Sequence, residues 1–347
     1  MTREATRRFA AIAPTGALAA ALLLALSARA FAQADFAGKS IKLYIGTGPG
    51  GGYDTYGRLV ARHIGRHLPG NPSVLAQNMP GASSLTLTNY LYNSAPRDGT
   101  AIGIINQAMP SEQYLDIGNA NYDSARFNWI GRVSSAVEMA IVWHTVPVAT
   151  IEDVRARETI MGGTGPTSST VFIPYLLDSL AGMKFKVITG FNGTTEIALA
   201  MERGEVEGSA TPLESLTSYR ADWVRDRKIR ILLQYTAVRD ADLADIPTMV
   251  ELGQTEEARR ILGFYASAAE IGRSIVAPPA LPPPVVAALR RAFDDMLRDP
   301  MFLDEARRSG IQLKSMAGER LQELVLQVAN FPSALLERAR RAREKPR

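Results

Sequence analysis

One β-rich run constrains the fold of this chain more than any other feature. Residues 129–147, WIGRVSSAVEMAIVWHTVP, are interrupted only by Ser134-Ser135. Strand and helix signals alternate before this run and again after it. An extended span of this length can leave one sheet and enter another. We therefore predict a first crossover between two lobes near residues 134–139.

The α/β sets on either side of this run have similar patterns. The first set predicts strands at 41–45, 74–77 and 100–105 and helices at 54–68 and 84–92. The second set predicts strands at 158–161, 185–188, 206–210 and 230–235 and helices at 167–181 and 195–203. Such alternation favours, in each lobe, a mostly parallel sheet flanked by helices.

The remaining chain leads back to the first lobe. We assign residues 266–276 to a return crossover, the prolines of 278–284 to a stiff lead-in to a helix at 285–297, and residues 318–329 to an amphipathic helix that packs across the lobes. The predicted fold class is α/β, with two lobes and two crossovers at the hinge between them. We expect a discontinuous first lobe at 33–137 plus 270–347 and a second lobe at 138–269, because roughly 315 residues exceed what one core usually supports.

The N-terminus has the pattern of a secretory signal peptide. Arg3, Arg7 and Arg8 precede an apolar run at 16–26, and Ala30-Phe31-Ala32 follows it. The apolar run is too short to span a bilayer stably. We expect residues 1–32 to be removed near Ala32 and the mature protein to lie in the periplasm. The sequence does not separate ordinary export from twin-arginine export.

Composition excludes several functional classes. The chain has 39 Lys and Arg residues against 35 Asp and Glu residues, and the signal segment holds four of the Arg residues and one Glu. The mature protein therefore has no strong positive field for nucleic acid. The absence of cysteine excludes disulfides, cysteine metal sites and a thiol nucleophile. We expect a monomer without a metal or cofactor.

A glycine-rich turn follows the first predicted strand. Gly46-x-Gly48-x-x-Gly51 satisfies the dinucleotide pattern, but the next strand ends Ala76-Gln77-Asn78 without the carboxylate that would bind a ribose. Pro49 also interrupts the motif, and no Gly-Lys-Ser/Thr follows. The remaining interpretation is a helix start near Asp54, the expected N-cap, whose free N–H groups favour a carboxylate or phosphate.

Two later loops repeat this construction. MGGTGPTSST at 161–170 places Ser168, Ser169 and Thr170 at a helix start, and TGFNGTTE at 189–196 does the same with Thr194 and Thr195. Each alone is compatible with an ordinary capped helix. All three loops follow predicted strands, where open α/β sheets bind ligands. Together they predict a cleft for an anionic small molecule.

Candidate catalytic residues are scarce. His63 and His67 have a spacing that could hold a metal, but no Glu follows His63, and Arg62 and Arg66 flank the pair. A solvated helix face is favoured. His144, the third histidine, has no adjacent nucleophile motif. We assign no catalytic residue.

The chain resembles the solute receptors of tripartite tricarboxylate transporters, also called Bug or TctC-like receptors. The resemblance rests on GPGGGYDTYGRLVARHI, NMPGASSLTLTNYLYNSAPRDGTAIG, GGTGPTSST, GFNGTTEIALAMERGEVEG and the segment from IVAPPALPPP to DEARRSG. It implies a two-lobed periplasmic binding protein of type II-like topology. Such a receptor closes around a carboxylate-bearing organic acid and delivers it to membrane transporter subunits. The residues that it implies for ligand binding are Gly51, Gly52, Tyr53, Asp54, Ser83, Gln107, Ser168, Ser169, Thr170, Gly193, Thr194 and Thr195.

One departure from the family pattern affects the expected ligand. Many relatives have Pro-Gly-Ala-Gly-Gly where this chain has Pro80-Gly81-Ala82-Ser83-Ser84. Hydroxyls replace bare backbone at that loop, so the ligand need not be citrate. Two alternatives stay open: an exported enzyme acting on a similar acid, and a receptor that feeds a sensor kinase.

Overall fold

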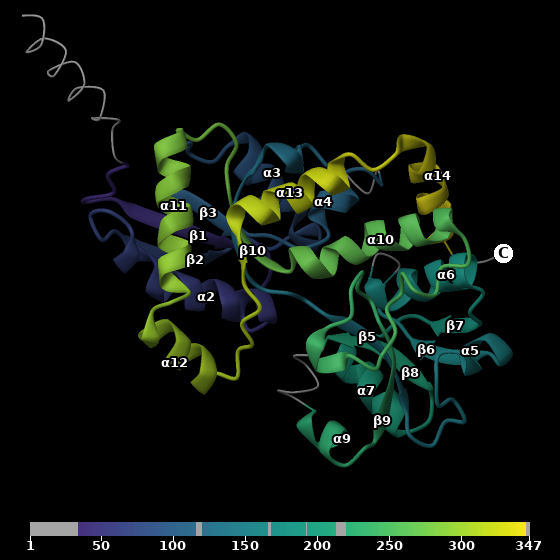
Figure 1. Ribbon diagram of the computed structural model, residues 1–347. Coiled ribbons are helices and arrows are strands. Elements are labelled where there is room, and N and C mark those ends of the chain that lie inside the picture. The colour runs from purple at the N-terminus through teal and green to yellow at the C-terminus, as the bar shows by residue number, and fades with distance from the viewer. Residues whose placement is uncertain (1–33, 116–119, 166–167, 192, 213–219, 345–347) are drawn as a thin grey trace, which may run out of the picture.

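The computed structural model describes residues 34–115, 120–165, 168–191, 193–212 and 220–344. The predicted signal peptide at 1–32 lies outside these residues. Figure 1 shows two groups of elements, each built around its own sheet, with α10 and the C-terminal helices running between them.

The first sheet contains six strands, ordered β11-β4-β10-β3-β1-β2. Its strands are β1 (Ser40–Ile45), β2 (Ser73–Asn78), β3 (Ala101–Ile104), β4 (Asn128–Ser134), β10 (Arg273–Ala277) and β11 (Met316–Ala317). The helices of this part of the chain are α2 (Gly52–Ile64), α3 (Leu85–Asn93), α4 (Met109–Glu112), α11 (Pro283–Met296), α12 (Pro300–Arg308) and α13 (Gly318–Ala329).

The second sheet contains five strands, ordered β7-β6-β8-β5-β9. Its strands are β5 (Glu138–Trp143), β6 (Thr159–Gly162), β7 (Phe185–Ile188), β8 (Gly208–Pro212) and β9 (Ile229–Gln234). The accompanying helices are α5 (Asp153–Ala156), α6 (Ser169–Ala181), α7 (Thr194–Glu202), α9 (Ala221–Arg225), α10 (Glu256–Ile271) and α14 (Ser333–Ala342).

The two-lobed α/β architecture is confirmed, but the sheets are mixed rather than mostly parallel. The pairs β1–β2, β1–β3, β6–β7 and β6–β8 are parallel, as helix-connected strands require. The antiparallel strand inside each sheet is the one that arrives through a crossover: β10 lies between β3 and β4, and β5 lies between β8 and β9. A strand that enters from the other lobe comes from the opposite direction, which alternation of elements along the sequence does not reveal.

The two crossovers lie beside each other. The first is the short link between β4 and β5, as the sequence predicts. The second lies between α10 and β10, where Gly272 has a φ of +54°. The link residue Ala136 donates its backbone N–H to the carbonyl of Ala269 at 3.0 Å. Residues 266–271, expected as extended chain, instead form the last turns of α10, a helix that the sequence analysis did not predict.

The helices cover the sheets with apolar faces. In the first lobe, Leu59, Val60 and Ile64 of α2 are fully buried in one cluster with β1 and with Phe293 of α11. Pro283 and Pro284 begin α11, because a helix start lacks acceptors for its first N–H groups. Among the helices of the described ranges, none is long and apolar enough to cross a membrane.

The C-terminal helices join the two groups. Helix α13 packs on β4 and α10, and α14 packs on α6 and α10. The expected lobe boundaries assign α14 to the first lobe, yet its packing partner α6 belongs to the second group of elements. The boundaries themselves stay a prediction.

The histidine pair, His63 on α2 and His67 in the 3-10 turn that follows, faces α12 and the residue before it instead of water. His63, 3% exposed, lies 2.6 Å from a carboxylate oxygen of Glu305, and His67 lies 3.1 Å from Asp299. The expectation of a solvated face is therefore wrong for His63, because α12 returns to cover that face of α2. Among the described residues, His, Asp and Glu side chains form no cluster of three or more that could hold a metal ion.

Candidate functional site

A cavity of about 640 Å³ lies between the two groups of elements. Its walls come from α2, the loops after β2, β3 and β6, the start of α6, the second half of α10 and the two crossovers. The loops that follow parallel strands meet here, as expected for an open α/β sheet. The size is typical of a small-molecule site.

Five of the residues selected from the sequence line this cavity. They are Tyr53, Ser83, Gln107, Ser168 and Ser169. Seven others lie outside its lining: Gly51, Gly52, Asp54, Thr170, Gly193, Thr194 and Thr195.

Asp54 supports the glycine loop from within the protein. It occupies the third position of α2, not the N-cap, which is Gly51. Its carboxylate accepts hydrogen bonds from the backbone N–H of Gly50 at 2.9 Å and from the side chains of Arg58 and Asn78 at 3.0 and 2.8 Å. Burial alone would raise the pKa of Asp54, but these donors hold it below its usual value. The carboxylate oxygens of Asp54 are therefore occupied in holding the glycine loop. The sequence pattern of a helix start did not distinguish this role from that of an N-cap.

The hydroxyls at the start of α6 divide between two roles. Ser168 is the N-cap, accepting from the backbone N–H of Thr170. The Thr170 hydroxyl is buried and accepts from the backbone N–H of Thr164 at 3.1 Å. Ser169, the first residue of α6, lines the cavity.

The third loop lies elsewhere. Thr194 and Thr195 line a separate cavity of about 90 Å³ together with Trp223 and Arg220. Strand β7, which precedes this loop, is at the edge of its sheet, so the loop is displaced from the centre where β6 and β8 end. The order of the strands in the sheet sets the position of this loop, and the loop sequence does not reveal that order.

Arg273 is the cation among the described cavity residues that sequence reasoning missed. It begins β10 at the return crossover and is 8% exposed. Its Nη1 donates to Oε1 of Gln107 at 2.9 Å, and its guanidinium lies 4.2 Å from the centre of the Tyr53 ring. Burial raises the pKa of Tyr53, and the charge of Arg273 opposes that rise. A lone basic residue in the apolar run IGRSIVAPP was the available signal.

The loop after β2 holds Ser83 in an unusual conformation. Ala82, Ser83 and Ser84 have φ values of 43°, 55° and 85°, a left-handed region that favours glycine. Ser84 is fully buried, and its hydroxyl has no hydrogen-bond partner among the described residues. This chain therefore places serine side chains in a backbone conformation that favours glycine.

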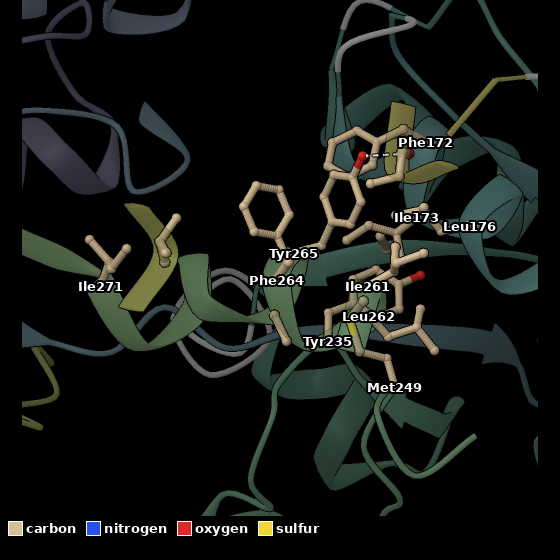
Figure 2. Packing of buried hydrophobic residues seen from close by; sticks show 14 of the residues in the cluster. Phe172, Ile173, Leu176, Tyr235, Met249, Ile261, Leu262, Phe264, Tyr265 and Ile271 are labelled. Carbon is tan, nitrogen blue, oxygen red and sulfur yellow. Dashed lines mark hydrogen bonds between the residues drawn. The ribbon is translucent and has the colours of Figure 1, made fainter. Parts of the chain in front are cut away.

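Aromatic side chains form the end of the cavity near α4, α6 and α10. Figure 2 shows Phe172 and Ile173 of α6 converging with Tyr265 of α10. The Tyr265 hydroxyl donates to the carbonyl of Ala339 at 2.8 Å, and the Tyr122 hydroxyl donates to the carbonyl of Met109 at the same distance. Both hydroxyls are therefore bonded to backbone, which leaves the rings to line the cavity.

Three charged side chains belong to the cavity lining: Arg273, Glu112 and Glu138. Glu112 accepts from Nη1 of Arg343 at 3.4 Å, and both side chains are largely buried. Burial raises the pKa of Glu112, and Arg343 opposes that rise. The Arg343 guanidinium also lies 4.5 Å from the centre of the Phe172 ring, outside the cavity lining.

Comparison with known proteins identifies a family and a relative that span most of this chain. The family described as "Tripartite tricarboxylate transporter family receptor" matches residues 57–339. A UPF0065 protein in the gbd 5' region of Cupriavidus necator is 26% identical over 336 residues, covering 94% of this chain and 96% of that protein.

Two solved structures share the fold. A TctC solute-binding protein from Polaromonas, without ligand, has a TM-score of 0.66 at 20% identity and covers 86% of this chain and 98% of its own. An R. palustris protein with adipate has a TM-score of 0.62 at 19% identity and covers 89% of this chain and 98% of its own.

Proposed function

The chain belongs to the tripartite tricarboxylate transporter receptor family, and from this premise we propose that it is a periplasmic receptor for a small carboxylate-bearing organic acid. Its two lobes close around the acid and deliver it to membrane transporter subunits. The exported location follows from the basic, apolar and Ala-x-Ala order of residues 1–32. The adipate bound to the R. palustris protein of the same fold supports the carboxylate class.

The observation that carries this proposal is the composition of the cavity. Arg273 and Gln107 contribute a buried cation and an amide from one side, and Ser168 and Ser169 contribute hydroxyls from the other. A guanidinium is suited to a carboxylate because its donors match two oxygens at once. Closure of the lobes would exclude water and strengthen these contacts.

A thermal-shift screen of the mature protein against mono-, di- and tricarboxylates tests the proposal. A bound acid stabilises the folded state in proportion to the logarithm of its concentration above the dissociation constant. Mass spectrometry of the denatured protein must first show that no acid was carried through purification. If the ligand-free protein is stabilised by no acid, the receptor proposal fails. Turnover of a bound acid would instead favour the exported enzyme.

A further inference from the structure

We propose that the solute is an aromatic monocarboxylate: one carboxylate beside Arg273 and a ring against Phe172 and Tyr265. This inference rests on the proposed receptor function and deepens it. It separates this chain's ligand from a dicarboxylate such as the adipate of the R. palustris protein. Three features of the cavity carry it.

The first feature is the balance of charge. Among the described residues, the lining contains one cation, Arg273, and two carboxylates, Glu112 and Glu138. A monoanion can bind beside the single guanidinium, which presents several N–H donors and can serve more than one acceptor. Because Glu112 is already paired with Arg343, a di- or tricarboxylate would bring its further negative charge into a space that holds the Glu138 carboxylate, and the described lining residues include no cation besides Arg273. Burial of such a charge without a partner is costly.

The second feature is the aromatic wall that Phe172 and Tyr265 contribute to the lining. Phe172 and Tyr265 have ring centroids 5.7 Å apart, and Ile173 lies beside them (Figure 2). Because the Tyr265 hydroxyl is bonded to Ala339, its ring and not its polar tip serves as the wall. Aromatic rings pack favourably against such walls in offset and edge-to-face arrangements.

The third feature is the state of Arg343, the cation nearest to that wall. It is 10% exposed, pairs with Glu112 and covers the Phe172 ring. A second carboxylate arriving there would compete with Glu112 for this guanidinium and would face the Glu112 charge. Arg343 therefore neutralises the aromatic end instead of preparing it for an anion.

Isothermal titration of the ligand-free protein with matched acids tests the inference. We expect 3-phenylpropanoate to bind at least about tenfold more tightly than adipate, and more tightly than hexanoate, which lacks the ring. The neutral amide 3-phenylpropanamide should lose binding, because its head group carries no charge for Arg273.

The outcomes separate this inference from the receptor function. Adipate or hexanoate binding as tightly as 3-phenylpropanoate would overturn the aromatic monocarboxylate and leave the receptor proposal standing. If neither these acids nor any acid of the wider screen binds, both the aromatic monocarboxylate and the receptor function are overturned.

A pair of variants checks the position of the ring. Phe172→Leu removes a lining ring, whereas Phe264→Leu makes the same change in a buried residue of α10 that lies outside the lining. We expect Phe172→Leu to weaken 3-phenylpropanoate about fivefold or more and Phe264→Leu to leave it nearly unchanged. Equal effects of the two variants, with both still folded by circular dichroism, would contradict a ring bound against Phe172.

Discussion

The guanidinium of Arg273 lies over the face of Tyr53, 4.2 Å from the ring centre. The two residues lie far apart in the sequence, Arg273 at the return crossover and Tyr53 in the first helix. Tyr53 is held in turn by Gln107, whose backbone N–H donates to its hydroxyl at 2.9 Å. The Tyr53 ring, the Gln107 amide and the Arg273 guanidinium thus form one polar wall of the cavity. The wall needs the return crossover, because Arg273 comes from β10 and not from the loops of the first lobe.

Replacing Arg273 should remove the cation of this wall. We expect Arg273→Gln to weaken binding of any carboxylate by about 2–3 kcal/mol, measured by titration calorimetry. Arg273→Lys should recover only part of the loss, because an ammonium lacks the planar fork and stacks less well on Tyr53. Arg259→Gln, on the exposed face of α10, is the control and should bind normally. Unchanged affinity in Arg273→Gln would remove this residue from the site.

Ser169 and Thr194 test which helix start contacts the solute. Ser169 lines the interlobe cavity, whereas Thr194 lines the separate cavity among α7, β5, β8 and α9. Ser169→Ala should weaken binding by about 1 kcal/mol, the value of one hydrogen bond, and Thr194→Ala should not change it. Calorimetric titration of both variants with the same acid distinguishes them. The opposite ranking would return the third loop to the binding site.

Ser84 stores strain that glycine would release. Its φ is +85°, and its buried hydroxyl has no described hydrogen-bond partner. We expect Ser84→Gly to raise the free energy of unfolding by about 1 kcal/mol in urea titrations. Ser179→Gly, at an exposed position inside α6, should lower it by about 0.5–1 kcal/mol. Destabilisation of similar size in both variants would mean that the left-handed turn is not strained.

Alanine substitutions at Gly272 and Gly263 should change the stability of the protein in opposite directions. A Cβ at Gly272 would lie 2.3 Å from the carbonyl oxygen of Ser134, at a φ of +54°. Gly272→Ala should therefore cost about 2–4 kcal/mol of stability or shift the crossover. A Cβ at Gly263, inside α10, meets only Val250 at 4.0 Å, so Gly263→Ala should stabilise by up to about 1 kcal/mol. Chemical denaturation measures both, and a stable Gly272→Ala protein would contradict the tight crossover.

Asp178 should make stability depend on pH. It lies on α6, accepts from the backbone N–H of Phe185 at 2.9 Å, and burial raises its pKa to about 7. The unfolded chain has the lower pKa, so the folded state holds the extra proton, and this carboxyl reduces stability as pH rises from about 4 through 7. Asp178→Asn keeps an acceptor without titrating. It should be more stable than wild type at pH 8 by about 1–2 kcal/mol, allowing for solvent screening, and equal to it near pH 4. A constant difference across this range of thermal melts would contradict the assignment.

Local sequence patterns predicted the bounds of many helices and strands. They did not predict which strands lie beside one another in the sheets. Helix 318–329 and strand 185–188 have the predicted bounds, because amphipathic period and short apolar runs depend on nearby residues. The insertion of β10 between β3 and β4 depends on residues far apart in sequence. That insertion brings Arg273 to the cavity, and the edge position of β7 removes Thr194 from it. The serines at 83–84 were visible as a departure from the family, but their left-handed backbone was not.

The exchange of strands between the two sheets also orders the folding of the chain. All five strands of the second sheet lie in one continuous stretch, from β5 to β9, so that sheet can form as soon as this stretch is available. The first sheet cannot, because β3 and β4 are joined only through β10, and the whole second sheet lies between Ser134 and its partner Arg273 in the sequence. Until β10 arrives, β3 and β4 each have an unpaired edge, a template for aggregation. The N-terminal lobe, although made first, is the one that must finish last.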